Sequence, residues 1–391
     1  CEDSQKFYNT LCNANLFPFV SIVRFANTEC SNTNIMSGTC LARRECNNLN
    51  GTIAGFCASR RGRCCVVTRA CGGTTNVNNT YFTSPGYPAA YSGGQACTII
   101  VNRCNSNICQ LRIDFLDMVL AQPDGDGNCV TDSVTISGGN TQVPVICGDN
   151  TGQTLFVDFN GNTAITITIS ATLSTTFSRR SLSALAPNGC LQYYTGTTGT
   201  ISSFNYGTSA NQILSASLVT GTRQIANLNY GICIRMEAGY CAIQYAQTSD
   251  IYSFTVSGDV EGADTTVLGT TLGALNNGAC TTDFVVIPNP YVVSTGLAAG
   301  TDRFCGIGFV TVQSKFYRVW RRVVLTTTRL MLSWPPFCHN TVSHNVQISV
   351  SVILSRCPFL SRRMESAHRS STSGVCPSVE KRTLNTCYIY V

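Results

Sequence analysis

Histidine is scarce in this chain, and the residues needed for covalent hydrolysis are not found together. Only three histidines occur among 391 residues, and all lie beyond residue 338. A serine or cysteine nucleophile needs a base within hydrogen-bond reach, and histidine is the usual one. No Gly-Asp-Ser-Gly-Gly sequence occurs, and acid pairs such as Asp114 with Asp117 are of the kind that is usually solvated. We therefore predict that the chain is not an enzyme.

Long apolar runs and paired metal-type cysteine motifs are missing too. A transmembrane helix needs roughly 18 apolar residues, and the longest candidate, near 346–354, is short and broken by serines. No pair of CxxC clusters has the spacing of a zinc ribbon or finger. We predict no membrane span, no metal and no cofactor. The chain begins at Cys1 without an apolar signal stretch, so either a signal peptide was removed or the start is a fragment.

Cysteine, by contrast, is abundant, with 23 residues. Glutathione would keep so many thiols reduced in the cytosol, so this count indicates a secreted disulfide framework in an oxidising compartment. The sequons at Asn50 and Asn78 fit a secreted glycoprotein. We predict an extracellular location.

The residues from 74 to about 310 are rich in Thr, Ser, Val, Ile, Gly and Asn. The alternation in 164–169 places isoleucines on one strand face, and turn signals such as Asn160-Gly161 recur at short intervals. No long amphipathic helix is evident here. This pattern predicts an all-β chain of antiparallel sandwiches.

A weak internal repeat divides this β-rich region. The pattern Cys-x-x-Asp-x-Val-x-Ile occurs at 129–136 and again at 280–287. Each copy is followed by Cys-Gly and preceded by a close cysteine pair, Cys104 with Cys109 in the first and Cys233 with Cys241 in the second. We expect two sandwiches, joined by a linker near 178–188.

The segment 314–391 differs in composition, with 11 Lys or Arg against two acidic residues. A nucleic-acid-binding tail is the weaker interpretation, because the change is abrupt and interrupts the expected closing strands of the second sandwich. A frame shift or a retained intron explains it better. We expect this segment to be disordered or mis-translated, so that its four cysteines lack designed partners (Cys338, Cys357, Cys376 and Cys387).

Six cysteines within 30–65, the last two adjacent, resemble the clip domain of arthropod serine proteases and their non-catalytic relatives. The resemblance implies three disulfides: Cys30 with Cys64, Cys40 with Cys57, and Cys46 with Cys65. A generic disulfide knot that serves as a spacer is an equal alternative, since six cysteines allow 15 pairings. Partners for Cys1, Cys12 and Cys190 stay open.

Residues 71–177 resemble a CUB domain, an extracellular binding module. The matching features are Cys71-Gly72-Gly73, the turn at 84–88, the motif at 129–136 and Cys147-Gly148. The resemblance implies disulfides that pair Cys71 with Cys97 and Cys129 with Cys147; in the second copy the corresponding cysteines are Cys280 and Cys305. A tryptophan of the family is replaced by Ile99, which can still fill a strand core.

Many CUB domains bind calcium, but only Asp132 maps clearly onto their ligands. The first ligand position holds Ala121, and the late loop at 171–174 has no acid. Because calcium takes six to eight oxygens, we expect a structural Asp132 that accepts loop N–H bonds. The run 124–128 resembles the start of an EF-hand loop but lacks the required Gly and Glu, so we expect an acidic turn.

The resulting domain order is an N-terminal segment (1–29), a clip-like knot (30–66), a CUB domain (71–177), a divergent CUB-like sandwich (188–313) and the basic tail (314–391). It resembles secreted arthropod CUB-domain proteins without a catalytic domain. The expected function is extracellular binding of protein or glycan, with no nucleic acid as partner. Candidate contact aromatics are Tyr87, Tyr91, Tyr193 and Tyr194.

Two other functions stay open: a non-catalytic cofactor of a clip-type serine protease cascade, and a structural matrix protein or lectin. The oligomeric state and the ligand are not determined by the sequence. Arg179-Arg180, in the expected linker, is a candidate site of proteolytic cleavage, although two solvated arginines are the simpler interpretation.

Overall fold

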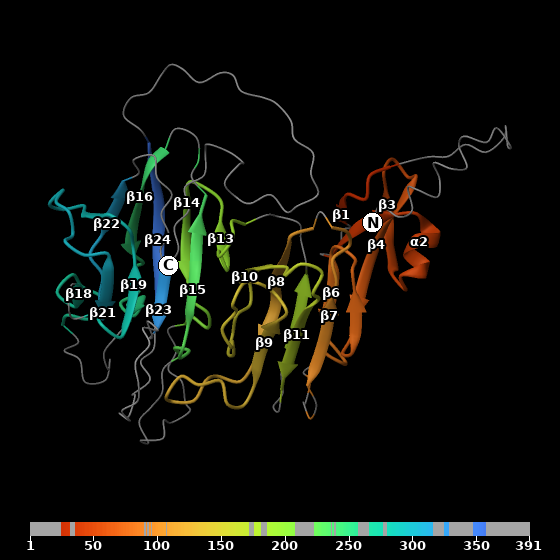
Figure 1. Ribbon diagram of the computed structural model, residues 1–391, viewed down its shortest axis with the longest axis horizontal. Coiled ribbons are helices and arrows are strands. Elements are labelled where there is room, and N and C mark those ends of the chain that lie inside the picture. Colours follow the sequence, from red (N-terminus) through yellow and green to blue (C-terminus); the bar gives the residue numbers. More distant parts are fainter. Residues whose placement is uncertain are drawn as a thin grey trace, which may run out of the picture.

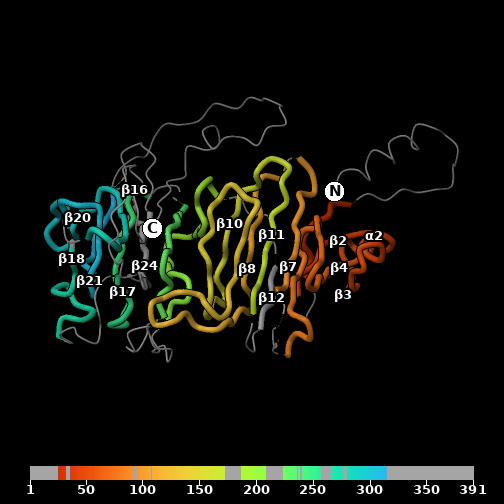
Figure 2. The backbone as a smooth tube through the Cα atoms, turned by 60° about the horizontal axis from the view of Figure 1, so that its bottom comes forward, coloured from red at the N-terminus to blue at the C-terminus, as the bar shows by residue number. Residues whose placement is uncertain are grey.

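The computed structural model consists of three parts in a row along its long axis (Figure 1), and the tube view shows the same order (Figure 2). Strands dominate, and the helix found in the described part is the short α2 (Arg43–Asn48). None of the described helices has the length and apolar character to cross a membrane. The structure describes residues 25–31, 36–89, 91, 94, 96–106, 108–171, 176–180, 186–207, 223–235, 237, 240–256, 266–276, 280–315, 324–327 and 347–356.

The first part is a small cysteine-rich module around α2. Its buried core contains Leu41, Cys46, Cys65 and Val67, so two of the four side chains belong to disulfides. A module this small cannot bury enough apolar surface to be stable without such cross-links. Its strands are β1 (Glu29–Ser31), β2 (Ser37–Leu41), β3 (Thr52–Cys57) and β4 (Gly62–Arg69).

The second part is a sandwich of two sheets. One sheet has the order β5-β7-β11-β9, and in the other β6, β12, β8 and β10 are neighbours. The strands are β5 (Gly73–Thr75), β6 (Thr80–Thr83), β7 (Cys97–Val101), β8 (Gln110–Val119), β9 (Ser133–Ser137), β10 (Thr154–Asp158), β11 (Ile165–Ser170) and β12 (Thr176–Arg180).

The module and the first sandwich share one sheet, because β4 pairs in parallel with β6, Val67 lying opposite Thr80. The Tyr81 hydroxyl accepts a hydrogen bond of 2.9 Å from the Ser37 N–H across this border. The predicted boundary between 30–66 and 71–177 therefore separates them in the sequence but not in the sheet.

The third part is a second sandwich with the sheets β13-β15-β23-β19-β21-β18 and β14-β24-β16-β22-β20, and β17 pairs with β24. Its strands are β13 (Gln192–Tyr194), β14 (Thr198–Ser202), β15 (Asn229–Ile234), β16 (Tyr240–Gln247), β17 (Phe254–Thr255), β18 (Ala274–Asn276), β19 (Asp283–Val286), β20 (Pro290–Val292), β21 (Arg303–Gly306), β22 (Val312–Lys315), β23 (Val324–Thr327) and β24 (Gln347–Arg356).

The alternation in β11 produces the expected inward face. Ile165, Ile167 and Ile169 are at most 4% exposed, whereas the intervening threonines are half-buried. Ile99, at the position of the family's tryptophan, is 2% exposed and lies in the same core. This core continues into the second sandwich as one cluster of buried residues.

We expected the second sandwich to lose its closing strands at residue 314, and this is wrong, because three strands at or beyond this position belong to its sheets. Strand β22 extends to Lys315, β23 pairs with β15 and β19, and β24 lies between β14 and β16. Serines alternate with apolar residues along much of β24, which is typical of a strand, although the segment as a whole is basic. The remaining residues of 314–391 lie outside the described part.

The linker predicted near 178–188 is partly a strand, because β12 extends to Arg180. Arg179 belongs to β12, where it pairs with Phe82 of β6 on one side and Phe115 of β8 on the other. A strand hydrogen-bonded on both sides cannot enter a protease as a free extended segment. This placement argues against cleavage at Arg179-Arg180.

Candidate functional site

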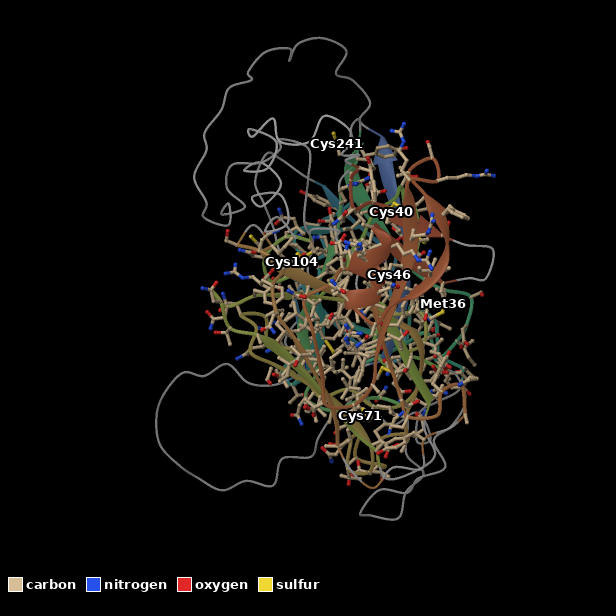
Figure 3. All side chains as sticks on the ribbon, turned by 90° about the vertical axis from the view of Figure 1, so that its right-hand side faces the viewer. Met36, Cys40, Cys46, Cys71, Cys104 and Cys241 are labelled. Atoms are coloured by element: carbon tan, nitrogen blue, oxygen red, sulfur yellow. A yellow bond between two sulfur atoms is a disulfide. The ribbon has the colours of Figure 1, made fainter. Side chains whose placement is uncertain are left out.

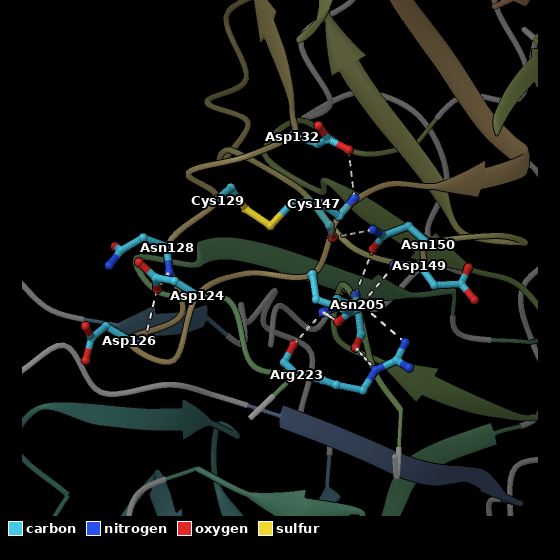
Figure 4. Close-up of a disulfide and its surroundings, with 12 residues drawn as sticks. Asp124, Asp126, Asn128, Cys129, Asp132, Cys147, Asp149, Asn150, Asn205 and Arg223 are labelled. Atoms are coloured by element: carbon cyan, nitrogen blue, oxygen red, sulfur yellow. Dashed lines mark hydrogen bonds between the residues drawn. A yellow bond between two sulfur atoms is a disulfide. The ribbon is translucent and has the colours of Figure 1, made fainter. Parts of the chain in front are cut away.

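The loops at one end of the first sandwich are joined by the disulfide between Cys129 and Cys147, whose Cα atoms are 5.6 Å apart (Figure 4). The bond connects the turn that follows β8 with the segment that precedes β10. Cys147 is fully buried. The disulfide therefore links these two loops covalently.

Asp132 lies behind this disulfide and has a structural contact. Its side chain is 1% exposed, and Oδ2 accepts a hydrogen bond of 2.9 Å from the Ala121 N–H. In the described part of the chain, no three His, Cys, Asp or Glu side chains come close enough to hold a metal ion. Asp132 therefore serves here as an acceptor for a backbone N–H of the loop.

Asp124 forms the acidic turn expected from the sequence. Its Oδ1 accepts hydrogen bonds from the N–H groups of Asp126, at 3.0 Å, and Asn128, at 2.7 Å. The turn residue Gly127 has φ +82°, a conformation that favours glycine. A side-chain oxygen that accepts two backbone N–H bonds stabilises the turn itself.

Asn205, from the second sandwich, inserts into these loops of the first. Its Oδ1 accepts from the Asp149 N–H at 2.9 Å, and its Nδ2 donates to Gln122 Oε1 at 2.8 Å and to the Arg223 carbonyl at 2.7 Å. Its own N–H donates to Asn150 Oδ1 at 2.8 Å. The side chain is fully buried, so these bonds are shielded from water.

The segment that connects the sandwiches is anchored by Gln110. Its side-chain amide donates to Asp158 at 2.6 Å and to the Ala186 carbonyl at 3.2 Å, and it accepts from the Ala186 N–H at 2.7 Å. Burial raises the pKa of the Asp158 carboxyl, and the hydrogen bonds from Gln110 and Thr141 partly offset this rise. The entry into the second sandwich is thus held by direct polar contacts.

Of the predicted contact aromatics, Tyr193 contributes to this junction, and Tyr194 is enclosed within the second sandwich. Tyr193 packs edge-on against Phe156 of the first sandwich, with ring centroids 6.1 Å apart. Burial raises the pKa of Tyr194 to about 12, because its hydroxyl end is enclosed. Tyr87 is 36% exposed and stays a candidate, and Tyr91 is half-buried.

The disulfides were anticipated in part. Within the module, which Figure 3 views end-on with Cys40 and Cys46 labelled, the bonds follow the pairing implied by the clip resemblance. Cys104 and Cys109 are both disulfide-bonded. The bonds of the module and sandwiches include Cys30–Cys64, Cys40–Cys57, Cys46–Cys65, Cys71–Cys97, Cys129–Cys147, Cys190–Cys233 and Cys280–Cys305.

The association of Cys233 with Cys241 is wrong. Cys233 bonds to Cys190, with Cα atoms 5.6 Å apart, and Cys241 is disulfide-bonded elsewhere. Cys233 lies in β15 and Cys241 in β16, which belong to different sheets of the sandwich. Parallel pairing of β13 with β15 brings Cys190 close to Cys233, and sequence spacing could not show this.

The remaining predicted positions have ordinary environments. Asp114 Oδ1 accepts hydrogen bonds from Arg112 of β8 and Thr154 of β10 at 2.8 and 2.7 Å, so this buried carboxylate links the two strands. The sequon residues Asn50 and Asn78 are exposed.

Three exposed valines lie close to Cys129 or Cys147 in the chain, or pair with Asp149 beside Cys147, and sequence reasoning missed them. Val130 and Val145 flank the two cysteines and are 68% and 46% exposed, and Val119, which bridges to Asp149, is 43% exposed. We call these three side chains the valine rim. Asp149 pairs with Val119, and residues 71–177 contain seven Asp and two Arg with no Lys or Glu. Exposed apolar residues rimmed by charge are typical of protein-binding surfaces.

Two family models match the chain, and together they span both sandwiches. The CUB domain model matches residues 71–181, and the animal CUB domain model matches residues 187–373. The second match extends well past residue 314, in agreement with the placement of β23 and β24. No curated protein matches the chain significantly.

Among solved structures, the chain is similar to the CUB1-EGF-CUB2 domains of rat MASP-1, with 11% identity, a TM-score of 0.23, and coverage of 72% of this chain and 99% of that one. It is also similar to the CUB1-EGF-CUB2 domain of human MASP-1/3, with 10% identity, a TM-score of 0.21, and coverage of 70% and 98%. A third is the full extracellular region of zebrafish Gpr126/Adgrg6, with 14% identity, a TM-score of 0.22, and coverage of 74% and 33%.

The prediction of a mostly β chain with tandem CUB domains behind a disulfide-rich segment is confirmed by the two family matches. The many disulfides and the CUB domains are consistent with an extracellular protein. The chain is a CUB-domain-containing protein with a disulfide-rich N-terminal region.

Proposed function

We propose that this chain is a secreted, non-catalytic glycoprotein that binds another protein through the valine rim of its first CUB domain. The observation that carries the proposal is the exposure of Val130, 68%, beside a disulfide that holds its loop in place. A fixed apolar surface loses little conformational entropy on binding. The acidic composition around the rim favours a partner with a basic surface.

The junction supports this proposal because it holds the loops in one arrangement. Asn205 contacts residues on both sides of the Cys129–Cys147 disulfide, namely Gln122 and Asp149. The valine rim is therefore presented by a preorganised loop end.

The test is capture of partners from extracellular fluid by the full chain and by the variant Val130→Lys/Val145→Lys. We expect the wild type to capture a partner that binds saturably. The double variant should bind that partner with about tenfold or more lower affinity. Leu297→Lys is the matched control, since Leu297 is also 68% exposed but belongs to the second domain. Equal binding by the wild type and the double variant would contradict the proposal that the partner binds to the valine rim.

A second candidate is a regulatory cofactor of a clip-type protease cascade, favoured by the three disulfides of the module, which follow the clip pairing. Deleting the module is not a clean test, because β4 pairs with β6 of the first domain. Binding of the intact chain to an activated clip-domain protease should be compared with binding to its zymogen by surface plasmon resonance. Absence of binding to both forms counts against this candidate.

A further inference from the structure

The disulfide-rich module carries a charge opposite to that of the domain to which it is attached. Residues 36–69 contain six Arg and one Glu, whereas residues 71–177 contain two Arg and seven Asp. Arg43, Arg44, Arg60 and Arg61 are exposed, and none of them forms an ion pair within the described residues. Their charges are thus available to an external anion.

Two of these arginines stand at the tip of the hairpin formed by β3 and β4. Three consecutive residues there, Ala58, Ser59 and Arg60, have φ values of +48°, +53° and +70°. Residues other than glycine rarely adopt this conformation, and runs of them occur where the surrounding structure enforces it. The tip is closed by a hydrogen bond of 3.1 Å from the Arg61 N–H to the Ala58 carbonyl.

The base of the hairpin explains how the tip is held. Cys57, the last residue of β3, is bonded to Cys40. A Cβ added at Gly62 would lie 2.6 and 2.7 Å from the Sγ atoms of Cys40 and Cys57. The first residue of β4 is therefore packed against the disulfide, and Arg60 and Arg61 are presented by a fixed turn.

A third arginine and an aromatic ring lie beside the tip. The Arg63 guanidinium stands 4.2 Å from the centroid of the Phe56 ring, and its Nη1 donates to the Arg60 carbonyl at 3.4 Å. Phe56 is 63% exposed, which is unusual for so large an apolar side chain. Cationic and aromatic groups thus occur together on one hairpin.

We propose that this basic hairpin, Phe56 with Arg60, Arg61 and Arg63, binds a sulfated polysaccharide. Planar guanidinium groups donate paired hydrogen bonds to tetrahedral oxyanions, and this geometry suits sulfate. The exposed Phe56 ring offers an apolar surface for a sugar ring. Because the tip itself carries arginines and the apolar ring lies behind it, the hairpin is not shaped to insert into a lipid surface, where apolar residues would lead.

The binding surface is separate from the valine rim, so the two proposals can fail independently. The test uses the full chain and immobilised heparin as the sulfated polysaccharide, with an unsulfated polysaccharide as reference. The variant Arg60→Asn/Arg61→Gln removes two charges, and asparagine at 60 tolerates the positive φ. We expect a loss of affinity for heparin of about tenfold to a hundredfold, as for two charge-assisted hydrogen-bond pairs.

The matched control is Arg43→Gln/Arg44→Gln, which removes two exposed charges from the same module but from α2. We expect this control to lose several-fold less affinity than the hairpin variant. Equal losses in the two variants would show attraction by net charge alone and would overturn the proposal. Equal binding to the unsulfated polysaccharide, or binding to phosphatidylserine vesicles in place of heparin, would overturn it as well. Circular dichroism of both variants establishes that the fold is retained.

Discussion

At the residue scale, the junction between the CUB domains depends on Asn205. This residue has φ +56° and is fully buried, and its amide satisfies groups from both domains. A Cβ at Gly148 would collide with its Oδ1, so the glycine is required for the close approach. A single side chain thus makes hydrogen bonds to groups of both domains.

Replacing Asn205 by alanine should lower the free energy of unfolding by about 2–4 kcal/mol, because several buried donors and acceptors lose their partner. Asn227→Ala is the matched control: Asn227 has φ +60° but is exposed, so it reports the backbone cost alone. Chemical denaturation of both variants measures the difference. Equal losses would mean that the amide contacts contribute nothing.

Tyr194 makes the stability dependent on alkaline pH. Its pKa is about 12 in the folded chain against 10 as the ordinary value, because burial disfavours the phenolate. The folded state keeps the proton longer, so stability is fully present below pH 10 and is lost as the pH rises toward 12, by about 2–3 kcal/mol. Tyr194→Phe should reduce this loss in denaturation series, and Tyr87→Phe, which alters an exposed ring, should not.

At the element scale, β11 and β24 show which strands a local sequence pattern predicts and which it does not. Strand β11 was predictable, since its isoleucines alternate and fill the core. Strand β24 was not, because its partners β14 and β16 lie more than a hundred residues earlier and the surrounding segment has a basic composition. The pairing of distant strands is decided by the sheet and not by the strand's own sequence.

The substitution Val350→Pro tests whether β24 pairs with β14 and β16. Val350 lies opposite Ile201 of β14 and Gln247 of β16, so proline removes a ladder N–H in the interior of the sheet. We expect a loss of about 3 kcal/mol or more and faster amide exchange in both neighbouring strands. Gln142→Pro, at an exposed position outside the strands, is the control. Unchanged exchange in β14 would show that β24 does not pair there.

At the scale of the whole molecule, the three parts are continuous. The module joins the first CUB domain through one sheet, and the two CUB domains share one cluster of buried residues. Continuous cores and sheets transmit unfolding from one part to the next. The module, the rim and the second domain therefore keep fixed positions relative to one another.

Calorimetry should accordingly show one cooperative transition for the described parts. Phe156 is 3% exposed at the junction, so Phe156→Ala should cost about 3–5 kcal/mol and lower the melting temperature of both domains together. Phe56→Ala, at a 63% exposed ring of the module, should leave the melting temperature nearly unchanged. Two well-separated transitions in the wild type would contradict this coupling.

Some features of the candidate sites were predicted from the sequence, and others were found only in the structure. The structural role of Asp132 and the acidic turn at Asp124 followed from residue types and spacing, because each concerns contacts within about a dozen residues. The valine rim and the basic hairpin were not predicted. Exposure of an apolar side chain depends on which neighbours cover it, and that information is absent from the local sequence.

The sequence by itself determined the β class, the disulfide-rich character and the resemblance to CUB domains, since strand alternation, cysteine content and short motifs are local properties. Only the tertiary structure decided that Cys190 bonds to Cys233, that Arg179 lies inside a sheet, that β24 closes the second domain and that Asn205 joins the two domains. The physical reason is that each of these contacts joins residues remote in the chain, and the choice among remote partners is made by the packing of the whole core.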